Sequence, residues 1–235
     1  MQTGQGIVWR RWLALGALGF AWSLPVEADV ILGSDNWDDA SQGLAGWQSA
    51  SGSSVVSRQD PGGTPGGWMQ IAFPEIDPFS SPGSSWYDLA YTPATNLFAG
   101  TWTTNMFVQF DFWASNQIPN QVAVRWQSLT NSYVWSHSVS IDSLQTWSSM
   151  SASLSDWQSW VLGPGASEDM FLSDLASINW IGVYIERNGA GAQNYGLDNF
   201  DLMVPEPGEV TMLVVALISA WGLQRRLRAG SGLRP

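Results

Sequence analysis

The chain contains no cysteine and no lysine, and it has a single histidine, His137. The absence of cysteine excludes disulfide bonds, thiolate metal sites and a cysteine nucleophile. With one histidine there is no histidine pair for a metal, and no Gly-x-Ser-x-Gly sequence or phosphate-binding loop is present. We therefore expect His137 to be a structural residue, and we expect a fold held by packing, with or without a bound cation.

Positive charge is also scarce. All nine basic residues are arginine, and six of them lie near the two termini. Between residues 29 and 204, Arg58, Arg125 and Arg187 face seventeen carboxylates, which gives a formal net charge of −14. Such a surface repels phosphate backbones and attracts divalent cations, so nucleic-acid binding is excluded.

Residues 1–28 have the three parts of a secretory signal peptide. Arg10 and Arg11 precede the uncharged run 12–24, and Ala28 supplies the small residue that signal peptidase requires. The apolar run is too short to span the roughly 30 Å hydrocarbon layer of a membrane comfortably. We expect cleavage after Ala28, so that the exported domain begins at Asp29.

The C-terminal segment 204–235 also has three parts. A short motif comes first, the uncharged apolar run 210–223 follows, and an arginine cluster ends it. The motif is Val204, Pro205, Glu206 and Pro207, and the cluster contains Arg225, Arg226 and Arg228. The order resembles the PEP-CTERM sorting signal of exopolysaccharide-producing Gram-negative bacteria.

This resemblance implies processing by an exosortase-type transpeptidase and transient anchoring in the inner membrane through a hydrophobic helix. The final location would be the cell surface or the extracellular matrix. The expected organisation is a signal peptide (1–28), an exported domain (29–203) and a sorting signal (204–235).

Glycine, serine, proline and asparagine clusters divide the exported domain into short apolar-rich runs. This spacing predicts an all-β, jelly-roll-like antiparallel sandwich. The expected strands are 30–37, 46–57, 67–73, 86–92, 105–114, 120–128, 132–141, 157–162, 178–187 and 195–203. One short helix is expected at 167–175, capped by Ser167.

Alternation along three of these strands separates an apolar row from a row of mixed aromatic and polar residues. In 178–187, for example, Ile181, Val183 and Ile185 oppose Trp180, Tyr184 and Glu186. If the three strands share a sheet, the mixed rows form one exposed surface of the kind that binds ligands. The candidate ligand-binding residues are Asp111, Trp113, Arg125, Gln127, Trp180, Tyr184 and Glu186.

Two stretches of the domain resemble galactose-binding-like jelly rolls. They are the acidic opening 35–39 with Gly46-Trp47, and the final strand 195–202. In that superfamily such positions hold a structural calcium ion, which implies Asp38, Asp39 and Asp198 as ligands. The alternative is that Asp198 and Asn199 bond to nearby backbone groups at the end of a strand.

Twelve of the sixteen tryptophans lie between residues 29 and 204. Indole rings stack on the C–H faces of sugars, but they also fill sandwich cores. We therefore expect a non-enzymatic surface or matrix protein that binds carbohydrate, such as an extracellular polysaccharide. Two alternatives stay open: a secreted polysaccharide hydrolase with a β-sandwich fold, and a purely structural matrix protein.

Overall fold

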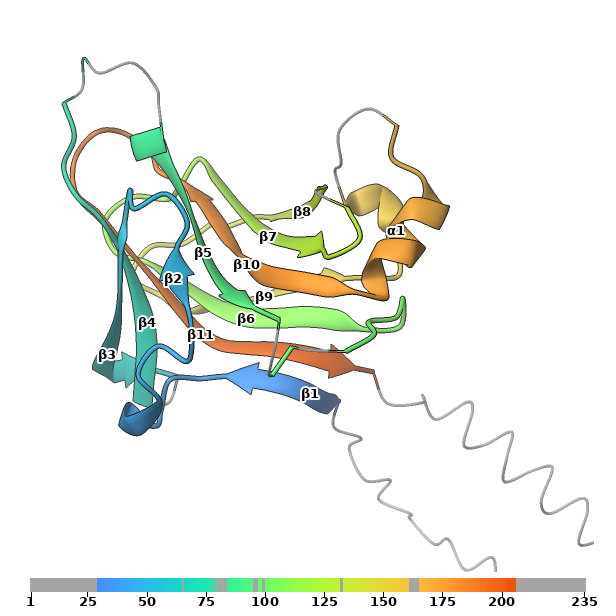
Figure 1. The fold of residues 1–235 in the computed structure, drawn as a ribbon. Coiled ribbons are helices and arrows are strands. Elements are labelled where there is room, and N and C mark those ends of the chain that lie inside the picture. The colour runs from blue at the N-terminus through green and yellow to red at the C-terminus, as the bar shows by residue number, and fades with distance from the viewer. Residues whose placement is uncertain are drawn as a thin grey trace, which may run out of the picture.

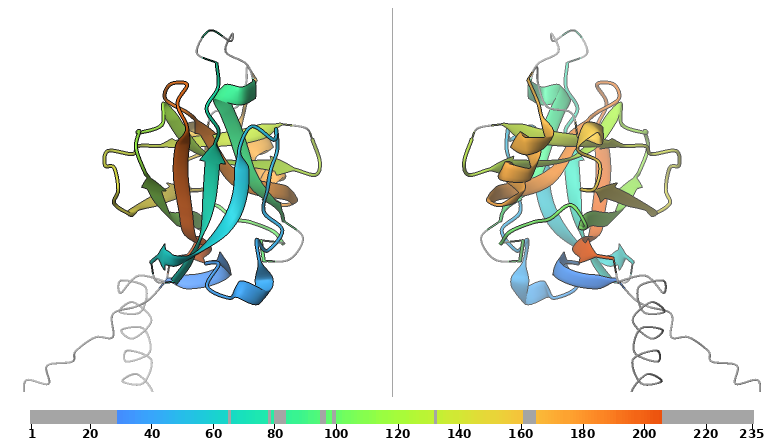
Figure 2. Two further views of the ribbon diagram at one scale, coloured as in Figure 1. Left: turned by 90° about the vertical axis from the view of Figure 1, so that its left-hand side faces the viewer. Right: turned by 90° about the vertical axis from the view of Figure 1, so that its right-hand side faces the viewer.

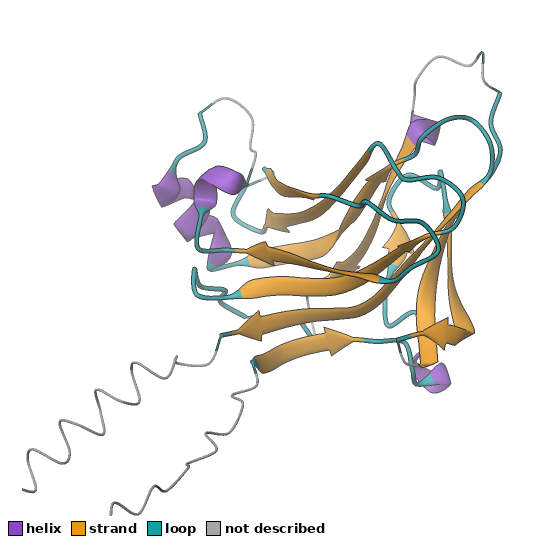
Figure 3. Ribbon diagram, turned by 180° about the vertical axis from the view of Figure 1, so that it is seen from behind, coloured by secondary structure: helices purple, strands orange, loops and turns teal. Residues whose placement is uncertain are grey.

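The computed structural model describes residues 29–205, apart from 65, 78, 80–83, 95–96, 99, 132 and 161–164. Strands form far more of the described chain than helices do, and the helices lie at the ends of the strands (Figure 3). The strands are β1 (Val30–Asp35), β2 (Gln48–Ser49), β3 (Val55–Gly63), β4 (Gly66–Phe73), β5 (Tyr87–Pro93), β6 (Phe107–Ala114), β7 (Gln121–Ser128), β8 (Val134–Val139), β9 (Ser148–Ser153), β10 (Ile178–Glu186) and β11 (Gln193–Val204). The helices are η1 (Ala40–Gln42), η2 (Ser84–Trp86), η3 (Trp157–Ser159) and α1 (Glu168–Leu175).

Two antiparallel sheets pack face to face (Figure 1). Sheet A has the order β3-β4-β11-β6-β9, with β1 paired to β11, and sheet B has the order β2-β5-β10-β7-β8. Figure 2 shows β3, β4 and β11 side by side at one end of the molecule. The predicted all-β antiparallel sandwich is confirmed.

The core between the sheets is rich in aromatic side chains. Sheet A contributes Phe110 and Phe112 of β6, and sheet B contributes Trp126 of β7 and Trp135 of β8, all with no exposed surface. The rings of Trp126 and Trp135 stack at 5.8 Å, and Phe171 of α1 packs against both. Each large ring buries on the order of 200 Å², so packing between rings holds the sheets together.

Strand β1 lies beside the last strand, and Val30 pairs with Val204. The first and last residues that the structure describes therefore leave the sandwich at the same place (Figure 1). The predicted signal peptide and nearly all of the sorting signal lie outside the described residues. Within the described part of the chain, none of the helices is both long enough and apolar enough to span a bilayer.

Three stretches differ from the strands predicted from the sequence. Segment 46–57 is not one strand, because β2 and β3 belong to opposite sheets. The start of 157–162 is the helix η3, since the Asp156 side chain accepts a hydrogen bond from the Gln158 backbone and caps a turn there. Strand β9 was not predicted, because its serine-rich sequence has little apolar signal. The helix capped by Ser167 is confirmed.

The side chain of Asp35 is poorly solvated. Asp35 of β1 is buried, and one of its oxygens, Oδ2, accepts a hydrogen bond of 2.7 Å from Trp47 Nε1. Burial raises the pKa of Asp35 from 3.8 to about 6, the Trp47 bond opposes this rise, and the neighbouring Asp201 adds to it. The folded state therefore holds a proton on Asp35 at pH values where the unfolded chain has released it.

The raised pKa of Asp35 predicts a loss of stability as the pH rises. Its contribution is fully present below about pH 4 and is lost as the pH passes through about 6. Asp35→Asn keeps an acceptor for Trp47 but cannot ionise. We expect the variant to gain roughly 1–3 kcal/mol over the wild type at pH 7, and little at pH 4, at about 1.4 kcal/mol per pKa unit. Urea unfolding at the two pH values measures the difference, and parallel pH profiles would contradict the prediction.

Candidate functional site

The outward side of sheet B carries aromatic and polar side chains from three adjacent strands. Since β5, β10 and β7 are neighbours, alternate residues of each strand point away from the core. We name the resulting surface the aromatic–polar face. Its residues are Tyr87, Tyr91, Arg125, Gln127, Trp180, Tyr184 and Glu186.

The strand register fixes the order of these side chains across the sheet. Gly182 of β10 pairs with Tyr91 of β5 on one side and with Arg125 of β7 on the other. Arg125 in turn pairs with Ser136 of β8. Gly182 cannot be replaced without strain, because a Cβ atom there would lie 2.2 Å from the backbone oxygen of Ala90.

Two ring pairs lie on this face. The centroids of Tyr91 and Trp180 are 5.8 Å apart in an edge-to-face arrangement, and those of Tyr87 and Tyr184 are 5.7 Å apart. Trp180 Nε1 donates a 2.8 Å hydrogen bond to Gln127 Oε1, which fixes the indole on the surface. Similarly, Tyr91 Oη accepts a 2.7 Å bond from the side chain of Gln48.

Tyr184 is covered by its neighbours. The Arg125 guanidinium lies 3.4 Å from the centroid of the Tyr184 ring, which is a cation–π contact. Tyr184 is 8% exposed, whereas Tyr87 is 43% exposed. Burial raises the pKa of the Tyr184 hydroxyl, and the charge of Arg125 opposes that rise. The open rings of the face are therefore Tyr87, Tyr91 and Trp180.

The structure brings together five of the seven candidate ligand-binding residues. Arg125, Gln127, Trp180, Tyr184 and Glu186 share the aromatic–polar face. The remaining two do not join them, because β6 belongs to sheet A. The prediction of one common surface is therefore wrong for Asp111 and Trp113.

Trp113 belongs to a separate cluster on the outward side of sheet A. Its ring lies 5.7 Å from Trp68 and 6.4 Å from Trp147. Gly196 of β11 lies beneath them, where a Cβ atom would be 2.8 Å from the Trp147 ring. Trp147 Nε1 donates to the Gly62 backbone oxygen at 3.0 Å, so this cluster holds the end of β3 on the sheet.

Asp111 belongs to a polar network beside that cluster. It accepts hydrogen bonds from Thr64 Oγ1 and Asn199 Nδ2, each at 2.9 Å. Asn199 lies in a bulge of β11 and has a positive φ of 47°, a conformation that asparagine tolerates better than most residues. The network ties the bulge to Thr64 in the β3–β4 connection.

Sequence reasoning missed the residues of the face that come from β5 and β2. Tyr87 and Tyr91 alternate along β5 as Trp180 and Tyr184 do along β10, and this alternation was the available signal. Gln48 had no such signal, because β2 is only two residues long.

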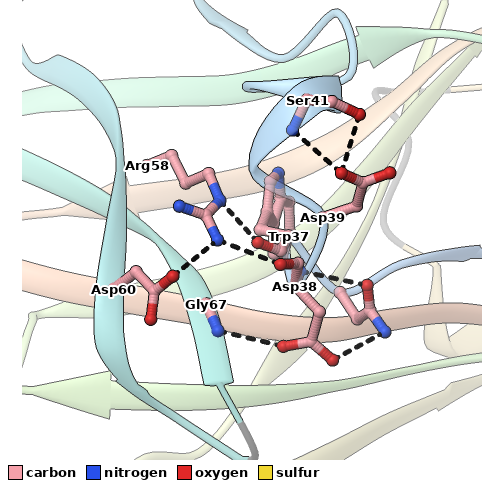
Figure 4. A network of polar contacts seen from close by, with 8 residues as sticks. Trp37, Asp38, Asp39, Ser41, Arg58, Asp60 and Gly67 are labelled. Carbon is pink, nitrogen blue, oxygen red and sulfur yellow. Dashed lines mark hydrogen bonds and ion pairs between the residues drawn. The ribbon is translucent and has the colours of Figure 1, made fainter.

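The three predicted calcium ligands accept hydrogen bonds from protein donors, and Figure 4 shows these bonds for Asp38 and Asp39. Asp38 Oδ1 accepts from the backbone of Gly67 at 2.9 Å, and Asp39 Oδ1 accepts from the backbone of Ser41 at 2.9 Å to cap η1. The Ser41 bonds lower the pKa of Asp39.

Asp198 is buried in sheet A. Its Oδ2 accepts from the Thr64 backbone at 2.6 Å and its Oδ1 from the Asn199 backbone at 2.9 Å. Burial raises its pKa to about 6.

The alternative in which Asp198 bonds to nearby backbone is thus the observed arrangement. Nowhere in the described part of the chain do three or more Asp, Glu or His side chains form a group able to hold a metal ion. The structure does not assemble Asp38, Asp39 and Asp198 into one site. Binding of a structural calcium ion stays a prediction.

His137 has the structural environment expected for it. Its Nδ1 lies 3.1 Å from Ser159 Oγ, and its ring is 5.2 Å from the Trp160 ring. Burial lowers its pKa. The imidazole thus packs between β8 and the segment after η3.

A cavity of about 400 Å³ lies away from the aromatic–polar face, where β1 and β5 approach the loop after η1. It is lined by Asp35, Gln42, Ala45, Gly46, Thr92, Pro93, Leu97 and Phe98. Asp35 is the single carboxylate among the described residues that line the cavity, and it already accepts the Trp47 hydrogen bond. These lining residues therefore do not include the second carboxylate that glycoside hydrolysis ordinarily needs.

Comparison with known proteins finds structures whose folds are similar to that of this chain. No family model matches the chain, and no curated protein matches its sequence. An exo-β-agarase structure is 15% identical at a TM-score of 0.50, over 76% of this chain and 25% of the agarase chain. This chain thus corresponds to about a quarter of that enzyme.

Two carbohydrate-binding modules are also similar. The family 11 module of the cellulosomal cellulase Lic26A-Cel5E of Clostridium thermocellum is 17% identical, with a TM-score of 0.48 over 76% of this chain and 95% of the module. The CBM22-1 xylan-binding domain of Paenibacillus barcinonensis Xyn10C is 14% identical, with a TM-score of 0.45 over 77% of this chain and 99% of that domain. At these identities the likenesses concern the fold alone.

The positions of the tryptophans predict a large and a small loss of stability on substitution. Trp126 has no exposed surface, so Trp126→Ala should lower the free energy of unfolding by roughly 3–5 kcal/mol. Trp180 lies on the aromatic–polar face and is only partly buried, so Trp180→Ala should cost less than about 1.5 kcal/mol. Thermal and urea unfolding of both variants measures the difference.

Trp126→Phe is the matched control for the first variant. Trp126 Nε1 is buried and has no hydrogen-bond partner within the described structure, so phenylalanine loses volume but no polar contact. We expect it to destabilise much less than alanine. Equal losses for Trp180→Ala and Trp126→Ala would show that the outward placement of Trp180 is wrong.

Proposed function

We propose that this chain is an exported, non-catalytic carbohydrate-binding protein, and that the aromatic–polar face of sheet B is its binding surface. The observation that supports this most directly is the arrangement of partly exposed Tyr91 and Trp180 beside amide and guanidinium groups. Apolar C–H faces of sugar rings stack on aromatic rings, and their hydroxyls need polar neighbours. The face supplies both kinds of group on adjacent strands.

The rings are fixed before any ligand arrives. Gln127 holds the Trp180 indole, and Gln48 holds the Tyr91 hydroxyl. Gly182 between them allows β5 and β10 to approach closely. A surface whose side chains are already ordered loses less conformational entropy on binding, which favours an extended ligand such as a polysaccharide.

The small number of carboxylates on the face favours binding over hydrolysis. Glycosidases generally use two carboxylates at a defined separation. Among the described residues that point outward from β5, β7, β8 and β10, Glu186 is the one carboxylate. The hydrolase alternative would need a second acid from outside this surface, and the structural-matrix alternative would leave the ordered rings without a ligand.

The proposal includes the topology and the location of the domain. The strand orders β4-β11-β6-β9 and β5-β10-β7-β8, with the chain passing between sheets, support a jelly roll. We propose export through residues 1–28, sorting through 204–235 by an exosortase-type transpeptidase, and residence at the cell surface or in the matrix of an exopolysaccharide-producing Gram-negative bacterium. The pairing of Val30 with Val204 is compatible with processing near both ends.

Binding of polysaccharide should depend on the rings of sheet B. We expect purified protein to bind at least one of mixed-linked β-glucan, xylan or agarose in affinity electrophoresis. Trp180→Ala and Tyr91→Ala should each weaken binding about tenfold, because loss of one stacking contact costs on the order of 1–2 kcal/mol. Retarded migration as a function of polymer concentration gives the affinities.

Trp147→Ala is the matched control, since Trp147 is also partly buried but packs on the outward side of sheet A. It should leave the affinity unchanged. Loss of binding in Trp147→Ala with retention in Trp180→Ala would move the site to the other sheet. Absence of binding to every polymer would favour the structural-matrix alternative.

Processing can be tested on protein isolated from its native host. Mass spectrometry should find Asp29 as the N-terminus, because Ala28 precedes the expected cleavage site. It should find no peptide beyond the motif at 205–207, because the apolar tail is removed on sorting. Mature protein that retains residues 210–228 would contradict the sorting proposal and leave the binding proposal intact.

A further inference from the structure

Two of the three arginines in the domain have protein partners that account for their charge. Arg58 forms an ion pair with Asp60, with Nη2 and Oδ2 3.1 Å apart. Arg187 is fully buried and donates to four backbone oxygens, those of Pro74, Gly189, Ala190 and Gly191. Both arginines therefore serve the fold.

Arg125 has no such partner. No carboxylate of the described residues lies within 4 Å of its guanidinium, although the domain has seventeen acids. Its Nε donates to Ser136 Oγ at 3.2 Å, and its planar group lies 3.4 Å from the centroid of the Tyr184 ring. Arg125 is thus half-buried and held in one orientation, and no carboxylate of the described residues pairs with its charge.

Such an arrangement costs free energy in the unliganded protein. Removing a charge from water is unfavourable unless an opposite charge or hydrogen bonds replace the water. The nearest acid along the face, Glu186, lies four residues from Gly182, the residue that pairs with Arg125. At about 3.3 Å per residue the two backbone positions are about 13 Å apart along the strand, and among the described residues Glu186 forms no ion pair with Arg125.

We propose that Arg125 selects polysaccharides that carry an anionic substituent, a carboxylate or a sulfate ester, at the aromatic–polar face. This inference rests on the proposed function and narrows its ligand class. A guanidinium binds planar or tetrahedral oxyanions with two parallel hydrogen bonds, which a lysine cannot reproduce. The ligand's anion would supply the opposite charge that the fold does not provide.

The net negative charge of the domain does not prevent this contact. At 0.15 M salt the Debye length is about 8 Å, so exposed acids farther away than this are largely screened. The contact at Arg125 is short and partly desolvated, and it is screened much less. Binding should therefore be measured at physiological ionic strength.

The test compares polymers that differ only in charge. Polygalacturonate is paired with its carboxyl-reduced form, and κ-carrageenan is paired with its desulfated form. We expect the wild-type protein to bind the charged member of at least one pair ten times more tightly or better, measured by titration calorimetry in 0.15 M salt. The pair that shows the difference identifies the anion as carboxylate or sulfate.

Variants of Arg125 assign the effect to this residue. Arg125→Gln should bring the ratio of the affinities for the charged and the neutral member of each pair close to one, and Arg125→Lys should recover only part of that ratio. Arg58→Gln, which removes the same charge from sheet A, should keep the wild-type ratio. Melting curves of all three variants check that the fold is retained.

The outcomes separate this inference from the proposed function. Equal wild-type affinity for both members of each pair, or an unchanged ratio in Arg125→Gln, would overturn the role of Arg125 and leave carbohydrate binding standing. No binding to any charged or neutral polymer would overturn both.

Discussion

The packing of Ile181, Val183 and Ile185 against sheet A forces the alternate residues of β10 to point away from the core. These three residues have almost no exposed surface, and the strand has a period of two. Trp180 and Tyr184 must therefore point away from the core. The same constraint acts on β5 and β7 through the core residues Ala90, Val124 and Trp126, so the aromatic–polar face follows from the way the core is filled.

Alternation predicted which side of a strand faces the core, but it could not predict which sheet the strand joins. In β6 the row with Asp111 and Trp113 has the same mixture of aromatic and polar residues as the outward row of β10. The two rows nevertheless lie on opposite surfaces of the sandwich, because β6 pairs with β11 and β10 pairs with β7. Pairing depends on contacts between residues distant in sequence, and the local pattern of a strand cannot predict these contacts.

Contacts between residues distant in sequence also explain why the acidic residues near the two ends of the domain do not form the predicted cation site. The sequence places Asp38 and Asp198 at positions compatible with a shared ion, and the structure places Asp38 in the loop after β1, the strand that pairs with the β11 strand of Asp198. Thr64, which follows β3, and Gly67 of β4 lie between them, however, and their backbone N–H groups each donate to an oxygen of one carboxylate. A turn with free N–H groups thus competes for the carboxylates that a cation would require.

The pairing of β1 and β11 has a mechanical consequence. Strand β11 is bonded along one side to β6 and along the other to β4 and then β1. If the protein is held at its C-terminus while a polymer pulls on sheet B, the tension enters the sandwich along the axis of β11. Force in that direction shears the hydrogen bonds of several strand pairs together, whereas separating the two chain ends would peel the Val30–Val204 pairs one after another. Anchoring at the C-terminal strand, as in the sorting proposal, would therefore place the domain in its more resistant geometry.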